Sequence, residues 1–238
     1  MIYITGDIHG SNDIHKLTRK TAKKAIRAGK SAYTFKDGDY LIICGDFGLI
    51  WYSPDSIYYK EAQYWLDWLN NQPYTTLFVD GNHENHDMLD AMSVTEWHGG
   101  KVHRITDKII HLMRGQVFDI DGNTFFTFGG ASSHDKQWRV KGVSWWEREL
   151  PNQDEIAEAR KNLTAHNNTV DFIITHCGPQ SLQNKVALFY PKDVLTQFFE
   201  DLEHSITYKQ WYNGHYHIDR RMGKHTLVYN KIITLNAE

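Results

Sequence analysis

Five short apolar segments of this 238-residue chain each end just before Asp, Asn or His, and glycines stand beside four of these ends. Continuous apolar runs of this length are typical of strands that are buried on both faces of a sheet. In sheets wrapped by helices, polar residues that follow the carboxyl ends of strands gather at one edge. The predicted strands are Met1–Ile4, Tyr40–Cys44, Thr75–Val79, Val170–Thr175 and Tyr208–Tyr212.

Helical patterns lie between these strands, because apolar residues recur there three and four positions apart. The first pattern starts at Ser11, a good helix cap, and ends near Gly29. It places Ile14, Leu17, Thr21, Ala25 and Ile26 on one stripe. The other predicted helices run from Ser56 to Asn70, from Pro151 to about Asn167, and from Asp193 to Leu202.

A second kind of strand, with turn residues close by, occurs in the middle and at the end of the chain. Asp121-Gly122 predicts a tight hairpin between Gln116–Ile120 and Asn123–Phe128. Val102–Ile105 and Ile109–Leu112 are expected to pair nearby, and His225–Tyr229 with Ile232–Leu235 is expected to form a hairpin around Asn230-Lys231. The mixture predicts an α/β fold with two mixed sheets and helices outside them.

Length and composition favour one soluble domain over residues 1–238, since single cores grow to roughly 250–300 residues before they split. The net charge of −3 gives no sign of the strongly basic domain typical of nucleic-acid binding. No basic-then-apolar leader and no apolar run of membrane-spanning length is visible, so we expect a cytoplasmic protein that does not contact a membrane. Cys44 and Cys177 form no CxxC pattern and are predicted to be buried free thiols.

The polar residues at the strand ends are those that hold divalent cations. Carboxylate oxygens and imidazole nitrogens suit Mn, Fe, Ni, Zn and Co, and Asp-x-His or His-x-His lets alternate side chains of an extended segment face one ion. Asp46 stands alone in its turn, so it is the candidate for a carboxylate that bridges two ions. The candidate residues at these strand ends are Asp7, His9, Asp46, Asn82, His83, His176, His215 and His217.

Taken together, the motifs resemble those of the calcineurin-like metallophosphoesterase superfamily, whose pattern is D-x-H, GD, GNH(D/E), a lone H and GH-x-H. The resemblance runs from Asp7 to His217. It implies a four-layer α/β/β/α sandwich of two mixed sheets flanked by helices, and two divalent ions, with Mn²⁺ expected first. It also implies that one ion is held by Asp7, His9, Asp46 and His217, and the other by Asp46, Asn82, His176 and His215.

The same resemblance implies hydrolysis of phosphate esters. We expect a water activated between the two ions to attack phosphorus, with Asp46 bridging the ions. His83, which the resemblance places near the substrate, is expected to protonate or stabilise the leaving oxygen. Glu84 is expected either to orient His83 by a hydrogen bond or to be a solvent-exposed residue at a helix entry.

Residues 129–151 form an insert after the strand at Phe125–Phe128, which resembles a GG-x-x-S-x-D-K-x-x-R…WW-x-x-E-x-P segment of a bacterial and phage subset of the superfamily. In this segment Arg139 could grip a phosphate, with Ser133 and His134 at the rim of the site. Trp145 and Trp146 could stack on a flat leaving group, or they could pack the insert onto the domain. Arg139 could instead pair with Asp135 or Glu147.

The substrate class is narrowed by what the second motif lacks. Protein Ser/Thr phosphatases of the superfamily continue GD as GD-x-x-DRG, whereas Gly45-Asp46 continues as Phe47-Gly48-Leu49. A phosphomonoesterase or phosphodiesterase acting on a small molecule or nucleotide is therefore the main prediction. A nuclease or RNA-processing phosphodiesterase is the alternative, with nucleic acid as substrate only. A protein phosphatase is less favoured because no DRG follows Gly45-Asp46, and an inactive binding scaffold is less favoured because every metal-ligand position is kept.

Overall fold

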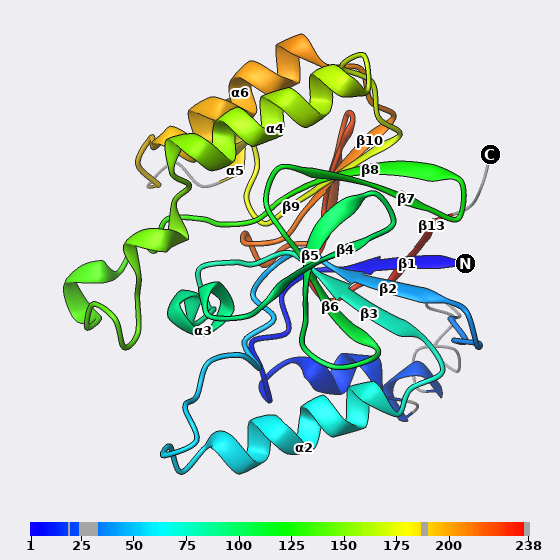
Figure 1. Ribbon diagram of the computed structural model, residues 1–238, viewed down its shortest axis with the longest axis vertical. Coiled ribbons are helices and arrows are strands. Elements are labelled where there is room, and N and C mark those ends of the chain that lie inside the picture. Colours follow the sequence, from blue (N-terminus) through cyan, green and yellow to red (C-terminus); the bar gives the residue numbers. More distant parts are fainter. Residues whose placement is uncertain (19, 24–32, 187–189, 236–238) are drawn as a thin grey trace.

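Two mixed β-sheets lie face to face, and helices cover the outer face of each (Figure 1). The structure is a computed structural model that describes residues 1–18, 20–23, 33–186 and 190–235. The predicted four-layer α/β/β/α sandwich is confirmed. None of the helices in the described part of the chain is long and apolar enough to span a membrane.

The first sheet has seven strands in the order β13-β1-β2-β3-β6-β5-β4. Its central strands β1, β2, β3 and β6 run parallel, so their carboxyl ends share one edge. The pairing of the hairpin strands β5 and β6 is antiparallel, as expected. The strands are β1 (Ile2–Thr5), β2 (Tyr40–Ile43), β3 (Thr75–Phe78), β4 (Val94–Trp97), β5 (Gly100–Arg104), β6 (Ile109–Leu112) and β13 (Ile233–Leu235).

The second sheet has six strands in the order β11-β12-β10-β9-β8-β7. Strands β8, β9, β10 and β12 are parallel, and β7 and β8 form the hairpin predicted around Asp121-Gly122. The strands are β7 (Gln116–Ile120), β8 (Asn123–Phe128), β9 (Phe172–Thr175), β10 (Gln210–Asn213), β11 (Arg220–Met222) and β12 (His225–Leu227).

Helix α2 and the short 3-10 helix η1 pack on the seven-stranded sheet, while α4 and α6 pack on the six-stranded sheet. Helix α4 begins with a capping box in which Asn152 and Glu155 exchange hydrogen bonds. The helices are η1 (Ile14–Leu17), α2 (Tyr59–Asn70), α3 (His86–Asp90), η2 (Lys136–Trp138), η3 (Glu147–Glu149), α4 (Gln153–Ala165), α5 (Gln180–Val186) and α6 (Val194–Ser205).

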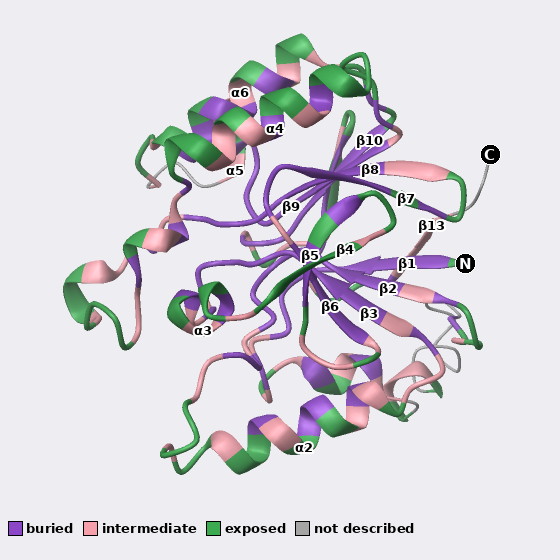
Figure 2. Cartoon of the chain, viewed as in Figure 1, coloured by how far each residue is buried: buried purple, intermediate pink, exposed green. Residues whose placement is uncertain are grey.

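Alternation along the strands explains why three apolar clusters form. In β1, Ile2 and Ile4 face the space between the sheets, whereas Tyr3 faces α2. The inner strands of both sheets are buried along most of their length, whereas the edge strands β4 and β11 are largely exposed, and the helices carry a buried stripe toward the sheets (Figure 2). The sheet that carries β1 is thus covered on both faces, which accounts for the unbroken apolar runs in the sequence.

The first and second predicted helices start differently from the expectation. The first begins with the 3-10 turn Ile14–Leu17, and its residues Ala25 and Ile26 and its end near Gly29 lie outside the described residues. The second begins at Tyr59 rather than Ser56, and Ile57 is 85% exposed, so its apolar side chain belongs to a surface loop.

The predicted C-terminal hairpin is wrong, because its two halves join different sheets. His225–Leu227 pairs with β10, whereas Ile233–Leu235 pairs with β1. The Asp219 carboxylate accepts hydrogen bonds from the backbone of Tyr229 at 2.8 Å and Lys231 at 3.1 Å. These bonds hold the connecting segment across the gap between the sheets, so no turn closes there.

Candidate metal centre

The loops that follow β1, β2, β3, β9 and β10 converge, and they carry the seven predicted metal ligands. Four of these residues have left-handed backbone angles: His9 (φ 41°), Asp46 (φ 48°), His215 (φ 67°) and His217 (φ 51°). Such angles are uncommon outside glycine and tend to gather where function requires a fixed geometry. The fold therefore keeps these side chains in place at some cost in backbone strain.

Two buried carboxylates lie at the middle of the convergence. Asp7 is 0% exposed and Asp46 is 2% exposed. The oxygens of Asp46 lie 3.3 Å from Nε2 of His9 and 3.2 Å from Nε2 of His176. In the described part of the chain, no Lys or Arg side chain makes an ion pair with either carboxylate. Buried carboxylates need a compensating cation, so this donor set fits divalent metal ions.

Ligand atoms within 4.8 Å of one another form two groups, and Asp46 belongs to both. One group is Asp7, Asp46 and His176, and the other is His9, Asp46 and His83. Asp46 is the residue common to both groups. The second group also contains His83, which the sequence analysis placed near the substrate.

Outer acceptors fix the orientation of two of the imidazoles. Nδ1 of His9 lies 2.8 Å from Oδ2 of Asp13, and Nδ1 of His176 lies 2.9 Å from the carbonyl oxygen of Cys44. Each acceptor takes the Nδ1 hydrogen, so Nε2 of both rings is directed at Asp46. This carboxylate–imidazole or carbonyl–imidazole arrangement is typical of metal-binding histidines.

The remaining predicted ligands surround the same point. Nε2 of His217 lies 3.5 Å from Asp7, and the His217 ring stacks on Tyr229 at 4.7 Å. The ring of His215 lies 4.9 Å from that of His176, and the His215 backbone donates to Asp7 at 3.0 Å. Oδ1 of Asn82 lies 3.2 Å from Nε2 of His176. The structure thus brings all seven predicted ligands together.

His83 lies on the outer side of this cluster, between an arginine and a tryptophan. Nη2 of Arg139 lies 3.2 Å from Nε2 of His83, and the Trp51 ring stacks on His83 at 5.8 Å. Burial lowers the pKa of His83, and the Arg139 charge adds to this effect, so that the pKa is about 4. The ring is therefore neutral at pH 7 and accepts a hydrogen bond from the guanidinium.

The insert reaches the site in more than one way. Arg139 makes the contact with His83 and also pairs with Asp135 at 2.7 Å. The His134 ring lies 5.0 Å from Tyr190, whose own ring lies 5.0 Å from His215. Trp146 is 3% exposed and donates Nε1 to Asp87, so the packing alternative holds for this residue. Ser133 is 4% exposed and lies behind Asn82 rather than at the rim.

Glu84 has neither of the two roles expected for it. It is 0% exposed, and its carboxylate accepts hydrogen bonds from the backbone of Phe47 at 2.6 Å and Gly48 at 3.2 Å. Burial raises the pKa of Glu84 well above its usual value, and the nearby Asp46 charge acts in the same direction. Glu84 therefore fixes the turn that carries Asp46.

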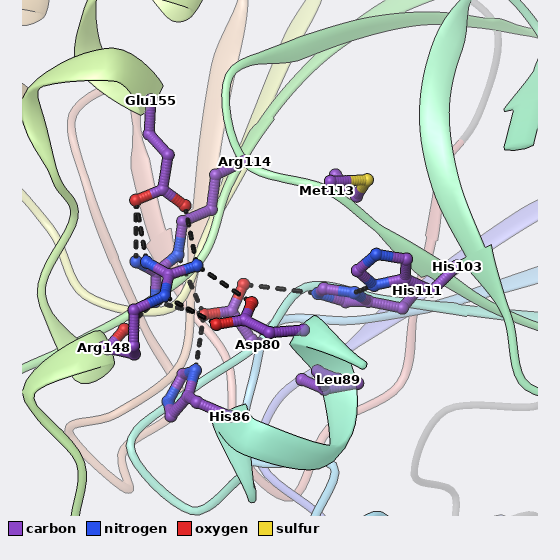
Figure 3. Close-up of a pocket in the computed structure, with 10 residues that line it drawn as sticks. Asp80, His86, Leu89, His103, His111, Met113, Arg114, Arg148 and Glu155 are labelled. Atoms are coloured by element: carbon purple, nitrogen blue, oxygen red, sulfur yellow. Dashed lines mark hydrogen bonds and ion pairs between the residues drawn. The ribbon is translucent and has the colours of Figure 1, made fainter. Parts of the chain in front are cut away.

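Behind β3, Asp80 anchors a second polar cluster, which is drawn in Figure 3. Arg114 donates Nε to Asp80 at 3.0 Å, and His111 lies 3.3 Å from the same carboxylate. Burial opposes ionisation of Asp80, but Arg114 outweighs it and holds the pKa well below the usual value. The cluster borders a cavity of about 30 Å³, which has room for about one water molecule. The polar cluster around Asp80 holds the end of β3, two residues before Asn82.

Two residues that support the predicted ligands were not predicted from the sequence. Asp13 follows His9 by four positions, a spacing that could have suggested the pair. Lys16 donates Nζ to the carbonyl oxygens of Gly6 at 2.9 Å, Asp7 at 2.7 Å and Tyr229 at 2.5 Å. No local pattern signals this role, since Tyr229 is 213 residues away from Lys16.

Comparison with known proteins places the chain in one family. A family model described as calcineurin-like phosphoesterase matches residues 1–219. No curated protein matches the sequence. Among solved structures, Thermus thermophilus sulfate thiohydrolase SoxB in complex with glycerol is similar, with 15% identity and a TM-score of 0.42 over 95% of this chain. This chain spans 38% of that structure's length. Because the family model covers almost the whole chain, the protein belongs to the calcineurin-like phosphoesterase family.

Proposed function

We propose that this protein hydrolyses a small phosphate monoester or diester, such as a nucleotide, at a centre of two divalent ions. The observation that carries the proposal is the shared position of Asp46 between two groups of ligand atoms. One ion would be held by Asp7, His9, Asp46 and His217, and the other by Asp46, Asn82, His176 and His215. We propose Mn²⁺ first, because the mixed oxygen and nitrogen donors suit it.

When bound, the ions supply Lewis acidity, which lowers the pKa of a water and offsets charge on the phosphoryl oxygens. The protein's own part is to hold the ligands with their lone pairs inward. Asp13 and the Cys44 carbonyl keep Nε2 of His9 and of His176 directed at Asp46. Lys16 and Glu84 fix the two turns from which Asp7 and Asp46 project.

Arg139 and His83 are proposed to bind the substrate as a pair. The neutral His83 ring accepts from Arg139 at 3.2 Å and holds the guanidinium beside the candidate ligands. A guanidinium in this position can donate two hydrogen bonds to phosphoryl oxygens. It also offers positive charge as the leaving oxygen departs. His83 would then stabilise the leaving group chiefly by placing Arg139, because its own pKa keeps it neutral.

Trp51 and His134 are proposed to bound the site on two sides. Trp51 covers one face of His83, so a flat leaving group would lie against its exposed edge. His134 lies on the side of His215, with Tyr190 between the two rings. Both would shape the choice of substrate and would leave the metal ligands unaffected.

A metal and substrate panel tests the proposal. Metal-free protein is loaded with Mn²⁺, Ni²⁺, Zn²⁺, Fe²⁺ or Mg²⁺ and assayed with para-nitrophenyl phosphate, its bis ester, nucleotides and oligonucleotides. Turnover of the monoester or of the bis ester, lost in Asp46→Asn, is the expected result. Activity on oligonucleotides alone would replace the proposal with a nuclease. Absence of turnover with every ion would overturn it.

A further inference from the structure

We propose that Ser133 and Glu149 set the orientation of the Asn82 side-chain amide, so that its oxygen faces the metal centre. The inference rests on the proposed function, in which Asn82 is a metal ligand. It gives Ser133 a positioning role, in place of the contact with substrate expected from the sequence. The base of the insert then becomes part of the metal centre.

The contacts form a chain of hydrogen bonds with one direction. Nδ2 of Asn82 donates to Oγ of Ser133 at 3.3 Å, and Oγ of Ser133 donates to Oε1 of Glu149 at 2.9 Å. At the other end of the same amide, Oδ1 lies 3.2 Å from Nε2 of His176. Asn82, Ser133 and Glu149 are 4%, 4% and 0% exposed, so solvent does not compete for these bonds.

Glu149 determines the direction, because every partner of its carboxylate is a donor. The backbone N–H of Ser133 donates to Oε2 at 2.8 Å, and Lys136 Nζ lies 3.5 Å from the same oxygen. The backbone N–H of Trp146 donates to Oε1 at 3.4 Å. An ionised carboxylate has no hydrogen and only accepts, so the Ser133 hydroxyl hydrogen is committed to it. The Ser133 oxygen is then left to accept from the amide NH2 group.

This commitment matters because the two ends of an amide have almost the same shape and opposite polarity. With its NH2 group turned inward, Asn82 would present hydrogens to a cation and could not ligate it. Shape alone does not separate the two orientations, but hydrogen-bond partners do. The carboxylate of Glu149 therefore selects, through one hydroxyl, the orientation that can bind metal.

One arginine holds both ends of this arrangement. Nη2 of Arg114 donates to the carbonyl oxygen of Arg148 at 2.7 Å, next to Glu149 in the chain. Arg114 also binds the carboxylate of Asp80, two residues before Asn82 (Figure 3). Arg114 thus ties the base of the insert to the loop that follows β3 and carries Asn82. At the tip of the insert Trp138 is 84% exposed, so the sequence of the tip can vary without affecting the metal centre.

The test is the affinity of metal-free protein for Mn²⁺, measured by titration calorimetry. Ser133→Ala should weaken one of the two Mn²⁺ sites by ~10–100-fold, the usual range for loss of a partner that orients a ligand. Glu149→Gln, which keeps the size of the side chain but adds a donor, should weaken the same site. Ser132→Ala is the matched control, since Ser132 contacts Lys136 and not Asn82. Its Mn²⁺ affinities should stay within about 3-fold of the parent.

A second set of variants, made in Asn82→Asp protein, separates an effect on amide orientation from a general structural effect. In Asn82→Asp the ligand is a carboxylate, whose two oxygens are equivalent, so no orientation has to be selected. Ser133→Ala should then cost less than about 3-fold in Mn²⁺ affinity. An equal cost of Ser133→Ala in both backgrounds would overturn the inference, as would unchanged affinity in the Asn82 background.

Asn82→Ala distinguishes failure of this inference from failure of the proposed function. If it leaves both Mn²⁺ affinities unchanged, Asn82 is not a ligand, and the proposed function loses part of its ligand set. If it weakens one site while Ser133→Ala and Glu149→Gln do not, the ligand set stands and only the orienting role is overturned. Thermal unfolding of the metal-free variants supplies a readout that is independent of turnover.

Discussion

Binding of two metal ions should release close to two protons at pH 7. In the metal-free protein, burial disfavours the charged form of His176, but Asp46 outweighs it and raises the pKa to about 9. His9 follows the same balance, and its pKa is about 8. In both rings Nδ1 is held by an outer acceptor, so the extra proton lies on Nε2, where it faces Asp46. A metal ion must displace it there.

The magnitude follows from these two pKa values. At pH 7 about 99% of His176 and about 91% of His9 is protonated, so metal loading should release ~1.9 protons from the two rings. Because both pKa values are raised, protons compete with metal ions for Nε2 of the two rings at pH values below these pKa values. This competition ends as the pH rises through the two pKa values. From pH 6 to pH 7 the product of the two binding constants should rise roughly 90-fold.

Titration calorimetry of Mn²⁺ into metal-free protein measures the release directly. At pH 7, in buffers of different ionisation enthalpy, the slope of the observed enthalpy gives the number of protons. His9→Ala should lower the release by about 0.9 proton, and any proton lost from a bound water cancels in this difference. His83→Ala is the matched control, because the pKa of His83 is about 4 and its ring is already neutral at pH 7. Release below about 0.5 proton, or the same release in His9→Ala, would refute this account.

Three further outcomes are expected. In para-nitrophenyl phosphate kinetics, Arg139→Lys should lower kcat/KM by ~10–100-fold, because an ammonium cannot reproduce the two parallel bonds of a guanidinium. Lys141 is an exposed residue of the same insert, and kcat/KM of the control variant Lys141→Ala should stay within about 3-fold of the parent. Gly214→Ala should weaken Mn²⁺ binding at least ~10-fold in calorimetry, since the new Cβ would lie 2.3 Å from Oδ1 of Asp7. Lys16→Met should lower the free energy of unfolding of metal-free protein by about 2 kcal/mol in urea denaturation, because three carbonyl oxygens lose their donor; an unchanged midpoint would contradict this.

The strand ends could be predicted from the sequence because parallel strands impose their own geometry. Once Met1–Ile4 and Tyr40–Cys44 are recognised as buried neighbours, Asp7 and Asp46 must emerge at the same edge. The prediction needed no knowledge of side-chain contacts. The prediction that these motifs meet at one edge therefore depended on topology, which apolar periodicity reports well. The division of their residues into seven ligands and His83 came from the family resemblance.

The supporting contacts could not be predicted, because they join residues that are distant in the chain. Glu84 binds the backbone 37 positions before it, and Glu149 reaches Asn82 only through Ser133. The prediction of a C-terminal hairpin was wrong for a related reason. Two short apolar runs separated by turn residues satisfy a hairpin pattern locally. In the structure, however, the first run pairs with β10 and the second pairs with β1.

Because of such distant contacts, the ends and the middle of the insert are under different structural constraints. Ser133 and Glu149, which lie near its two ends, are buried and bonded to each other, and Ser133 is also bonded to Asn82. Its middle, from Trp138 to Val143, is largely exposed, and only Arg139 turns back to His83. A change of substrate can therefore act through the middle while the ends continue to hold the amide of Asn82. On this argument, exchange of residues 138–143 should alter kcat/KM between substrates and leave Mn²⁺ affinity unchanged, and a joint loss of both would show that the two parts are not independent.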